Sequence, residues 1–117
     1  MTKFGIILTQ GPYQTQRWDT AYQIARAALH GSDKVVFFLF MDGVYNALAT
    51  ERFPAMKQLP KDCFKSLLDE GAEIYACEVC TYNRGLEEGK DYLKGVEIIG
   101  AVFASEMVSK CDRIITL

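Results

Sequence analysis

The run KVVFFLF at residues 34–40 constrains the fold more than any other segment. Successive side chains of a strand point to opposite faces of a sheet, so a strand that is apolar throughout needs cover on both faces. Helices packed on each side of a parallel sheet supply that cover. Four other apolar segments of strand length lie at residues 3–9, 72–77, 96–100 and 113–117.

Helical segments separate most of these strands. Apolar residues between Trp18 and Leu29 recur at helical spacing, with Thr15 as a candidate N-cap, before the sequence HGSD ends the helix. A second helix is predicted at residues 61–71, where Gly71 suits the left-handed backbone of a helix end, and a third at 101–111. The inward side chains of the second helix are Cys63, Phe64, Leu67 and Leu68.

The order of these segments predicts the fold class. Strand, helix, strand, helix, strand, loop, strand, helix and strand follow one another over residues 1–117. We therefore predict a single α/β domain with a mostly parallel five-stranded sheet and helices on both faces. Residues 41–49 are expected to turn through Gly43 into a short helix or an irregular loop, and residues 51–60 to be exposed and mobile.

Composition and charge exclude several classes of function. A net charge of −2 argues against direct nucleic-acid binding, which requires clustered positive charge. The longest apolar run, at residues 35–41, is too short to span a bilayer. The N-terminus shows no cleavage site of a signal peptide, so we expect a cytoplasmic protein whose four cysteines remain reduced.

Three loops are expected to meet at the carboxyl edge of the sheet, where open α/β domains bind ligands. They are TQGPYQTQ, MDGVYN and CEVCTYNRG, which follow the first three strands. Asp42 and Gly43 are first of all turn residues and only secondarily site residues. Tyr13, Tyr45 and Tyr82 are candidates to wall a pocket there, and equally to pack against neighbouring subunits.

Cys77 and Cys80 form a C-x-x-C pair in the third of these loops. A zinc site within one subunit is not expected, because structural zinc needs about four ligands. We interpret His30 as a solvated helix-end residue and not as a ligand. A thioredoxin-type dithiol would open a helix, and the residues after Cys80 are poor helix material. We therefore predict no metal and consider the dithiol interpretation the weaker one.

Burial as small apolar groups is the preferred interpretation of Cys63 and Cys111, and it is an even choice for Cys80. Cys77 differs because it ends a strand at the ligand-binding edge. An ordinary thiol is only a few per cent ionised at neutral pH, and lowering its pKa by one unit takes about 1.4 kcal/mol. Loop N–H groups or Arg84 could supply that energy, so we favour a reactive thiol at Cys77.

Four segments, in order, resemble the DsrE/DsrF-like sulfur-relay family, which includes TusD-like small sulfurtransferase subunits. They are GPYQTQRWDTAYQIARAAL, DKVVFFLFMDGVYNAL, YACEVCTYNRG and GVEIIGAVFASEMVSKCDRIITL, and together they cover most of the chain. The third segment matches a pattern in which a cysteine after the third strand precedes a loop ending in Arg-Gly, here Arg84 and Gly85. The family cysteine falls on Cys77, and Cys80 occupies a loop position where the family often has small apolar residues.

The resemblance implies a sulfur carrier or sulfurtransferase that passes sulfane sulfur between proteins through a persulfide on Cys77, with no cofactor. It implies sulfur-donor and sulfur-acceptor proteins as partners, and assembly into a homotrimer, a hexamer or a hetero-oligomer of related subunits. Cys80 would resolve the persulfide, form a disulfide with Cys77 or be inert. Two alternatives remain: a non-catalytic assembly or regulatory subunit, and a Cys77/Cys80 dithiol redox protein.

Overall fold

The sheet in the computed structural model, which describes residues 1–50 and 59–117, contains five strands that are all parallel. Their spatial order is β4-β3-β2-β1-β5, so β2 lies at the centre. This confirms the predicted α/β fold class. The strands are β1 (Lys3–Leu8), β2 (Lys34–Leu39), β3 (Glu73–Cys77), β4 (Glu97–Ile99) and β5 (Arg113–Thr116).

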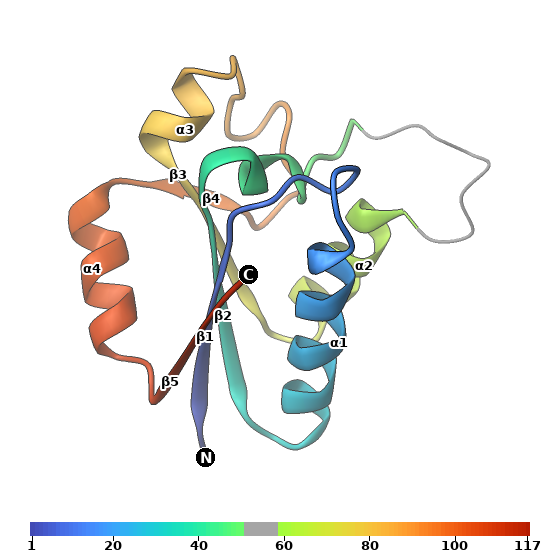
Figure 1. Ribbon diagram of the computed structural model, residues 1–117, viewed down its shortest axis with the longest axis vertical. Helices are drawn as coiled ribbons and strands as arrows, with labels where there is room; N and C mark the ends of the chain where they lie inside the picture. Colours follow the sequence, from blue (N-terminus) through green and yellow to red (C-terminus); the bar gives the residue numbers. More distant parts are fainter. Residues whose placement is uncertain (51–58) are drawn as a thin grey trace.

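Helices cover both faces of the sheet, as predicted (Figure 1). On one face lie α1 and α2, which contact each other, and on the other lies α4. Two short helices, η1 and α3, lie at the upper end of the sheet in this view. The bounds are α1 (Arg17–His30), η1 (Met41–Tyr45, a 3-10 helix), α2 (Pro60–Asp69), α3 (Glu78–Tyr82) and α4 (Ala101–Ser109).

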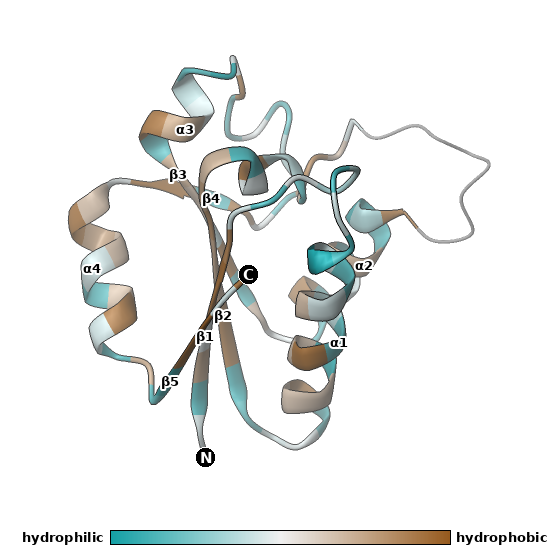
Figure 2. Cartoon of the chain, in the orientation of Figure 1, coloured by the Kyte–Doolittle hydropathy of each residue, from teal (hydrophilic) through white to brown (hydrophobic). Residues whose placement is uncertain are grey.

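The apolar run of β2 forms the centre of the core, as its sequence requires. Each residue from Val35 to Leu39 is at most 7% exposed. Phe37 meets Phe64 of α2 edge to face with ring centroids 5.3 Å apart, whereas Phe38 points to the opposite face and stacks on Phe40. Figure 2 shows the same concentration of apolar residues along the central strands. Burying each such side chain contributes about 1.5–3 kcal/mol, so β2 anchors both layers.

The observed helix ends agree only in part with those predicted from the sequence. Thr15 is not the N-cap of α1, because the helix begins one residue later and Gln16 takes that position. The Thr15 hydroxyl instead accepts a hydrogen bond from the Arg17 N–H at 3.3 Å. Gly71 has the predicted left-handed backbone, with φ of 101°, just beyond the end of α2.

The segment after Cys77 is helical where a loop was predicted. Glu78–Tyr82 forms the single turn α3, although its composition is a poor match to a helix. Burial and side-chain bonding stabilise it: Thr81 is fully buried, and its hydroxyl donates to the Glu78 carbonyl at 2.7 Å. The predicted exposure of residues 51–60 falls mostly on 51–58, outside the described residues, but Pro60 is buried and opens α2.

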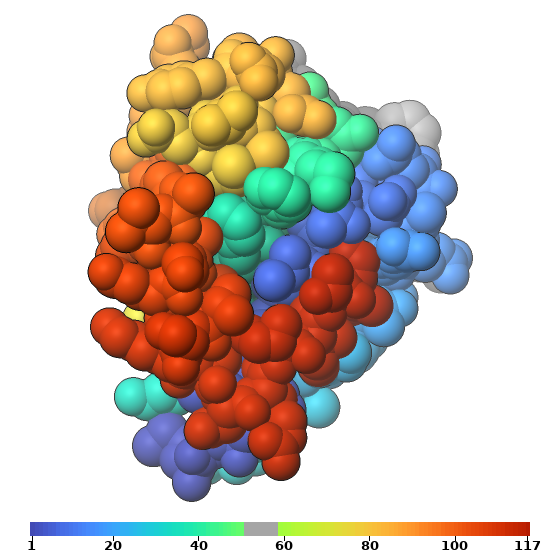
Figure 3. All heavy atoms as spheres, turned by 60° about the vertical axis from the view of Figure 1, so that its left-hand side comes forward, coloured from blue at the N-terminus to red at the C-terminus, as the bar shows by residue number. Residues whose placement is uncertain are grey.

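Most residues of the outer helix α4 are at least partly exposed. Met107 is its one buried residue, and Val102 and Phe103 are 77% and 46% exposed. Figure 3 shows this face of the molecule, on which α4 lies below α3 and beside the C-terminal residues. None of the described helices has the length and apolar character needed to cross a membrane.

Candidate functional site

The segments after β1, β2 and β3 meet at the carboxyl edge of the sheet, because parallel strands end at the same side. η1 begins two residues after β2, and α3 begins directly after β3. These two short helices contact each other. The predicted cysteine loop therefore lies against the loop that carries Asp42.

Cys77 is both the last residue of β3 and the residue before the first turn of α3. It pairs with Ile99 of β4, so the sheet holds its backbone. The side chain is 9% exposed. Cys77 makes no side-chain capping bond, and its thiol instead contacts that of Cys80, one helical turn later. Both cysteines are free thiols.

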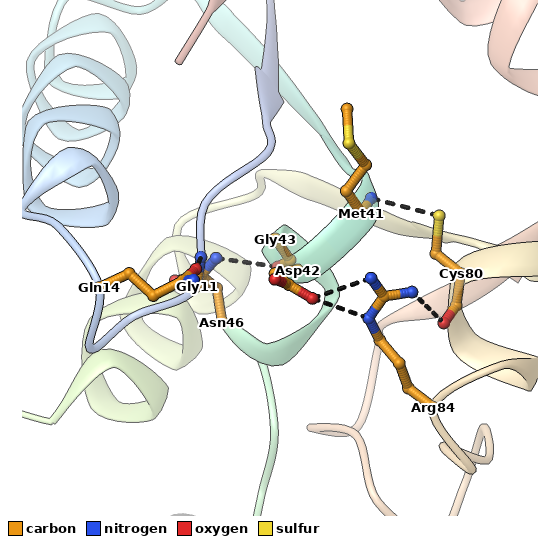
Figure 4. Close-up of polar contacts among 8 residues, drawn as sticks. All are labelled: Gly11, Gln14, Met41, Asp42, Gly43, Asn46, Cys80 and Arg84. Carbon is orange, nitrogen blue, oxygen red and sulfur yellow. Dashed lines mark hydrogen bonds and ion pairs between the residues drawn. The ribbon is translucent and has the colours of Figure 1, made fainter.

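Cys80 is 8% exposed and receives a backbone hydrogen bond. The Met41 N–H donates to the Cys80 Sγ at 3.2 Å (Figure 4). Met41 presents this N–H from a left-handed backbone with φ of 51°, which is uncommon for a residue other than glycine. Burial raises the pKa of Cys80, and the contact with Cys77 raises it further, whereas the Met41 N–H and Arg84 lower it. Since burial is the largest effect, the pKa of Cys80 lies above its ordinary value, and the group is a thiol at neutral pH.

Arg84 connects α3 to η1. Its Nε and Nη2 contact Asp42 Oδ1 at 2.9 and 2.8 Å, and its Nη1 donates to the Cys80 carbonyl at 3.1 Å (Figure 4). Asp42 raises the pKa of the guanidinium, which stays charged. Both side chains are partly exposed, so we assign this ion pair a contribution of only about 0–1 kcal/mol. Its main effect is to hold the two loops in one arrangement.

Gly85 allows the backbone of this loop to reverse direction after α3. Its φ of 69° is left-handed, which favours glycine, and it ends the turns that follow α3. The Gly85 N–H donates to the Tyr82 carbonyl at 3.2 Å, and the Leu86 N–H returns to Thr81 at 3.0 Å. The Arg-Gly pair thus combines an ion-pairing side chain with a chain reversal.

A pocket of about 280 Å³ lies beside η1 and shares Asp42 with the ion pair. Tyr13 and Tyr45 line it, as the sequence suggested, together with Gly11, Pro12, Gln14 and Leu48. The Gln14 side chain accepts a hydrogen bond from the Gly11 N–H at 2.8 Å, which closes one wall (Figure 4). Tyr82 is 72% exposed on α3 and is not part of the lining.

Gly43 and Asn46 hold η1 in place. A Cβ on Gly43 would overlap the Leu8 carbonyl oxygen and lie 2.7 Å from its carbon, so no larger residue fits. Asn46 is fully buried, and its Nδ2 donates to the carbonyls of Gln10 and Gly43 at 2.8 Å each. The Asp-Gly turn signalled Gly43 in the sequence, whereas Asn46 has no local pattern that distinguishes it from a surface residue.

The other candidate ligands are dispersed. Within residues 1–50 and 59–117, no three His, Cys, Asp or Glu side chains gather in a way that could hold a metal ion. His30 ends α1, is 57% exposed and lies 3.5 Å from Glu70. Cys63 is buried in α2, and Cys111, which is half-buried, donates to the Met107 carbonyl. The site therefore offers two adjacent thiols, an amide donor and a charged guanidinium.

The chain resembles known proteins over nearly its whole length, both in sequence and in structure. The family model described as the DsrE/DsrF-like family matches residues 2–117. A protein of Methanopyrus kandleri described as uncharacterised is 30% identical, over 94% of this chain and 89% of that one. The sulfurtransferase TusD of Cronobacter sakazakii is 25% identical, over 97% and 98% of the two chains. The crystal structure of the YchN protein from E. coli has the same fold, with a TM-score of 0.90 at 22% identity over the full length of both chains.

Proposed function

The chain belongs to the DsrE/DsrF-like family, and from this premise we propose that it is a sulfur carrier that holds sulfane sulfur as a persulfide on Cys77. The observation that supports this most is the position of Cys77, at the carboxyl end of β3 where the cysteine pair meets η1. The name of the relative TusD, a sulfurtransferase, agrees with sulfur relay.

The proposed reaction is a thiol exchange. The Cys77 thiolate attacks the outer sulfur of a donor persulfide, the sulfur–sulfur bond of the donor breaks, and the donor leaves as a thiolate. An acceptor thiolate then attacks the outer sulfur on Cys77 and regenerates the Cys77 thiolate. The sulfur atom keeps its oxidation state in both steps, so no cofactor is needed. Arg84 and the Met41 N–H each lower the pKa of Cys80 and so favour negative charge beside Cys77.

Sulfur-donor and sulfur-acceptor proteins would approach over the apolar residues around the cysteines. Val79, Tyr82 and Met41 are 64%, 72% and 49% exposed. Val102 and Phe103 of α4 extend the apolar surface over the next helix. We expect this surface also to support assembly with copies of the chain or with related subunits, because exposed apolar patches mark protein contacts.

A non-catalytic assembly subunit is the second candidate, and the low exposure of Cys77 favours it. Labelling of the folded protein with iodoacetamide separates the two functions. A carrier should react at Cys77 before unfolding, whereas a packed cysteine should react only once the chain is unfolded.

Sulfur loading tests the carrier directly. The reduced Cys80→Ser variant would be treated anaerobically with a polysulfide, desalted, and mapped by mass spectrometry; Cys80→Ser leaves Cys77 as the only thiol of the pair. We expect one added sulfur on Cys77, which an added thiol acceptor removes. Cys111→Ser is the matched control and should load like the parent, because serine can keep the bond to Met107. Equal loading of Cys77→Ser would refute the proposal.

A further inference from the structure

The cysteine pair occupies the two ends of one helical turn. Cys77 precedes α3 and Cys80 is its third residue, so both side chains lie on the same side of the turn. Their thiols are already in contact. A disulfide joins two sulfurs at about 2.05 Å, and here it would link neighbouring side chains of one helical turn.

The surroundings of Cys80 differ from those of a cysteine that merely fills space. It receives the Met41 N–H at 3.2 Å, and its own carbonyl is bound by Arg84. Met41 presents this N–H to the sulfur from a left-handed backbone, which is uncommon for a residue other than glycine.

We propose that Cys80 is a resolving thiol: it attacks a Cys77 persulfide, releases hydrosulfide and leaves a Cys77–Cys80 disulfide. This inference rests on the proposed function, because it needs sulfur on Cys77. It adds a second outcome to the carrier reaction. A docked acceptor takes the outer sulfur, and in the absence of an acceptor Cys80 discharges it as sulfide.

The step balances without an added oxidant. The sulfur of Cys80 bonds to the Sγ of Cys77, and the bond between that Sγ and the outer sulfur breaks. The electron pair of the broken bond leaves with the outer sulfur, which is reduced from sulfane sulfur to sulfide, while the two cysteine sulfurs are oxidised to the disulfide. The proton of the Cys80 thiol ends on the departing sulfur, giving hydrosulfide. A cellular dithiol reductant would then restore the pair.

The competition depends on Cys80 keeping its proton. Burial raises the pKa of Cys80, so its protonated thiol attacks a neighbouring persulfide only slowly. The other charged or titratable groups around it are Cys77, Arg84 with its partner Asp42, and Tyr92, whose pKa the Cys80 charge helps to raise. This arrangement gives the loaded carrier time to meet its acceptor.

The test follows the fate of sulfur after the donor is gone. The reduced full chain and its Cys80→Ser variant would be loaded briefly with polysulfide under anaerobic conditions and desalted. Sulfide release is then followed with time, and the Cys77–Cys80 peptide is mapped at each point. We expect the parent to release one hydrosulfide for each disulfide formed, and the variant to retain its persulfide and release none. Cys80→Ala serves as a second variant, with circular dichroism to check folding, and Cys111→Ser should behave like the parent.

The possible outcomes separate this inference from the carrier function. A stable Cys77 persulfide in the parent, with no sulfide, would overturn the resolving role and leave the carrier standing. Sulfur found on Cys80 without a disulfide would also overturn it, because the persulfide would then have moved instead of being reduced. Failure of the folded Cys80→Ser and Cys80→Ala variants to load at Cys77 would remove the carrier function itself.

Discussion

Gly43→Ala should destabilise the protein more than its small size change suggests. The added methyl group would overlap the Leu8 carbonyl oxygen and lie 2.7 Å from the carbonyl carbon, and carbon atoms normally pack at about 3.5–4.0 Å. The obstacle is backbone of the buried strand β1, which cannot rotate away as a side chain could. η1 must therefore move by about 1 Å relative to β1.

The magnitude follows from two contributions. Overpacking of a well-packed interior costs about 1–3 kcal/mol. Moving η1 also disturbs the hydrogen bonds that join it to β1 and the residues after β1. They run from the Phe40 N–H to the Leu8 carbonyl at 3.0 Å and from Asn46 Nδ2 to the Gln10 carbonyl at 2.8 Å, and each is worth about 1 kcal/mol. We expect a loss of about 3–5 kcal/mol in the free energy of unfolding.

Urea unfolding in the presence of a reductant measures this loss. With a slope of about 1–3 kcal/mol per molar urea, the midpoint should fall by at least about 1 M. Gly31→Ala is the matched control: Gly31 ends α1 with φ of −85°, and a Cβ there would make ordinary contacts of 3.5 Å. That variant should be unchanged or more stable by about 0.4–1 kcal/mol. A loss below about 1 kcal/mol for Gly43→Ala would refute the steric argument.

Three further predictions concern polar contacts at or near the site. Arg84→Gln removes a charge that lowers the pKa of Cys80, so the pKa of Cys80 should rise. Iodoacetamide labelling of Cys80, measured against pH in a Cys77→Ser background, should then slow by about tenfold for each unit of that rise. Asp42→Asn leaves the guanidinium uncompensated and should shift the profile the opposite way; a shift in the same direction for both variants would contradict the assignment. Tyr92→Phe removes the 2.8 Å bond to the buried Val44 carbonyl and should cost about 1–3 kcal/mol, whereas exposed Tyr82→Phe should be neutral. Burial raises the pKa of Tyr92, so above about pH 10 the Tyr92 hydroxyl keeps its proton in the folded state and loses it in the unfolded chain. The parent should therefore lose stability above about pH 10, and Tyr92→Phe should lose less.

The fold was predictable because its signals are local and repeated. The apolar run of β2 required cover on both faces, and the order of strands and helices left a parallel sheet as the simple solution. Helix ends were less predictable: Thr15 resembles a cap, but the chain begins α1 one residue later. α3 escaped prediction because its stability comes from burial of Cys80 and Thr81, which no propensity expresses.

The sequence predicted which loops form the site, but it did not predict the contacts between their residues. Parallel topology alone brings Asp42 and the cysteines to one edge. That Arg84 pairs with Asp42, 42 residues away, depends on the packing of η1 against α3, as does the bond from Met41 to Cys80. The carrier role of Cys77 and the contributions of Tyr13, Gly85 and Cys80 remain predictions for the loading experiments.

The neighbours of β1 have a consequence for how the protein folds. β1 pairs with β2 on one side and with β5 on the other, and the contact between Lys3 and Asp112 joins residues 109 positions apart. Closing so long a segment costs entropy before any contact is gained, which places this topology among the slower folders. While the chain emerges from the ribosome, the first four strands can assemble around the cysteine loop with one flank of β1 still lacking hydrogen-bond partners. Such an edge can recruit other chains, so the interval before β5 docks is the period in which a nascent copy is most prone to aggregate.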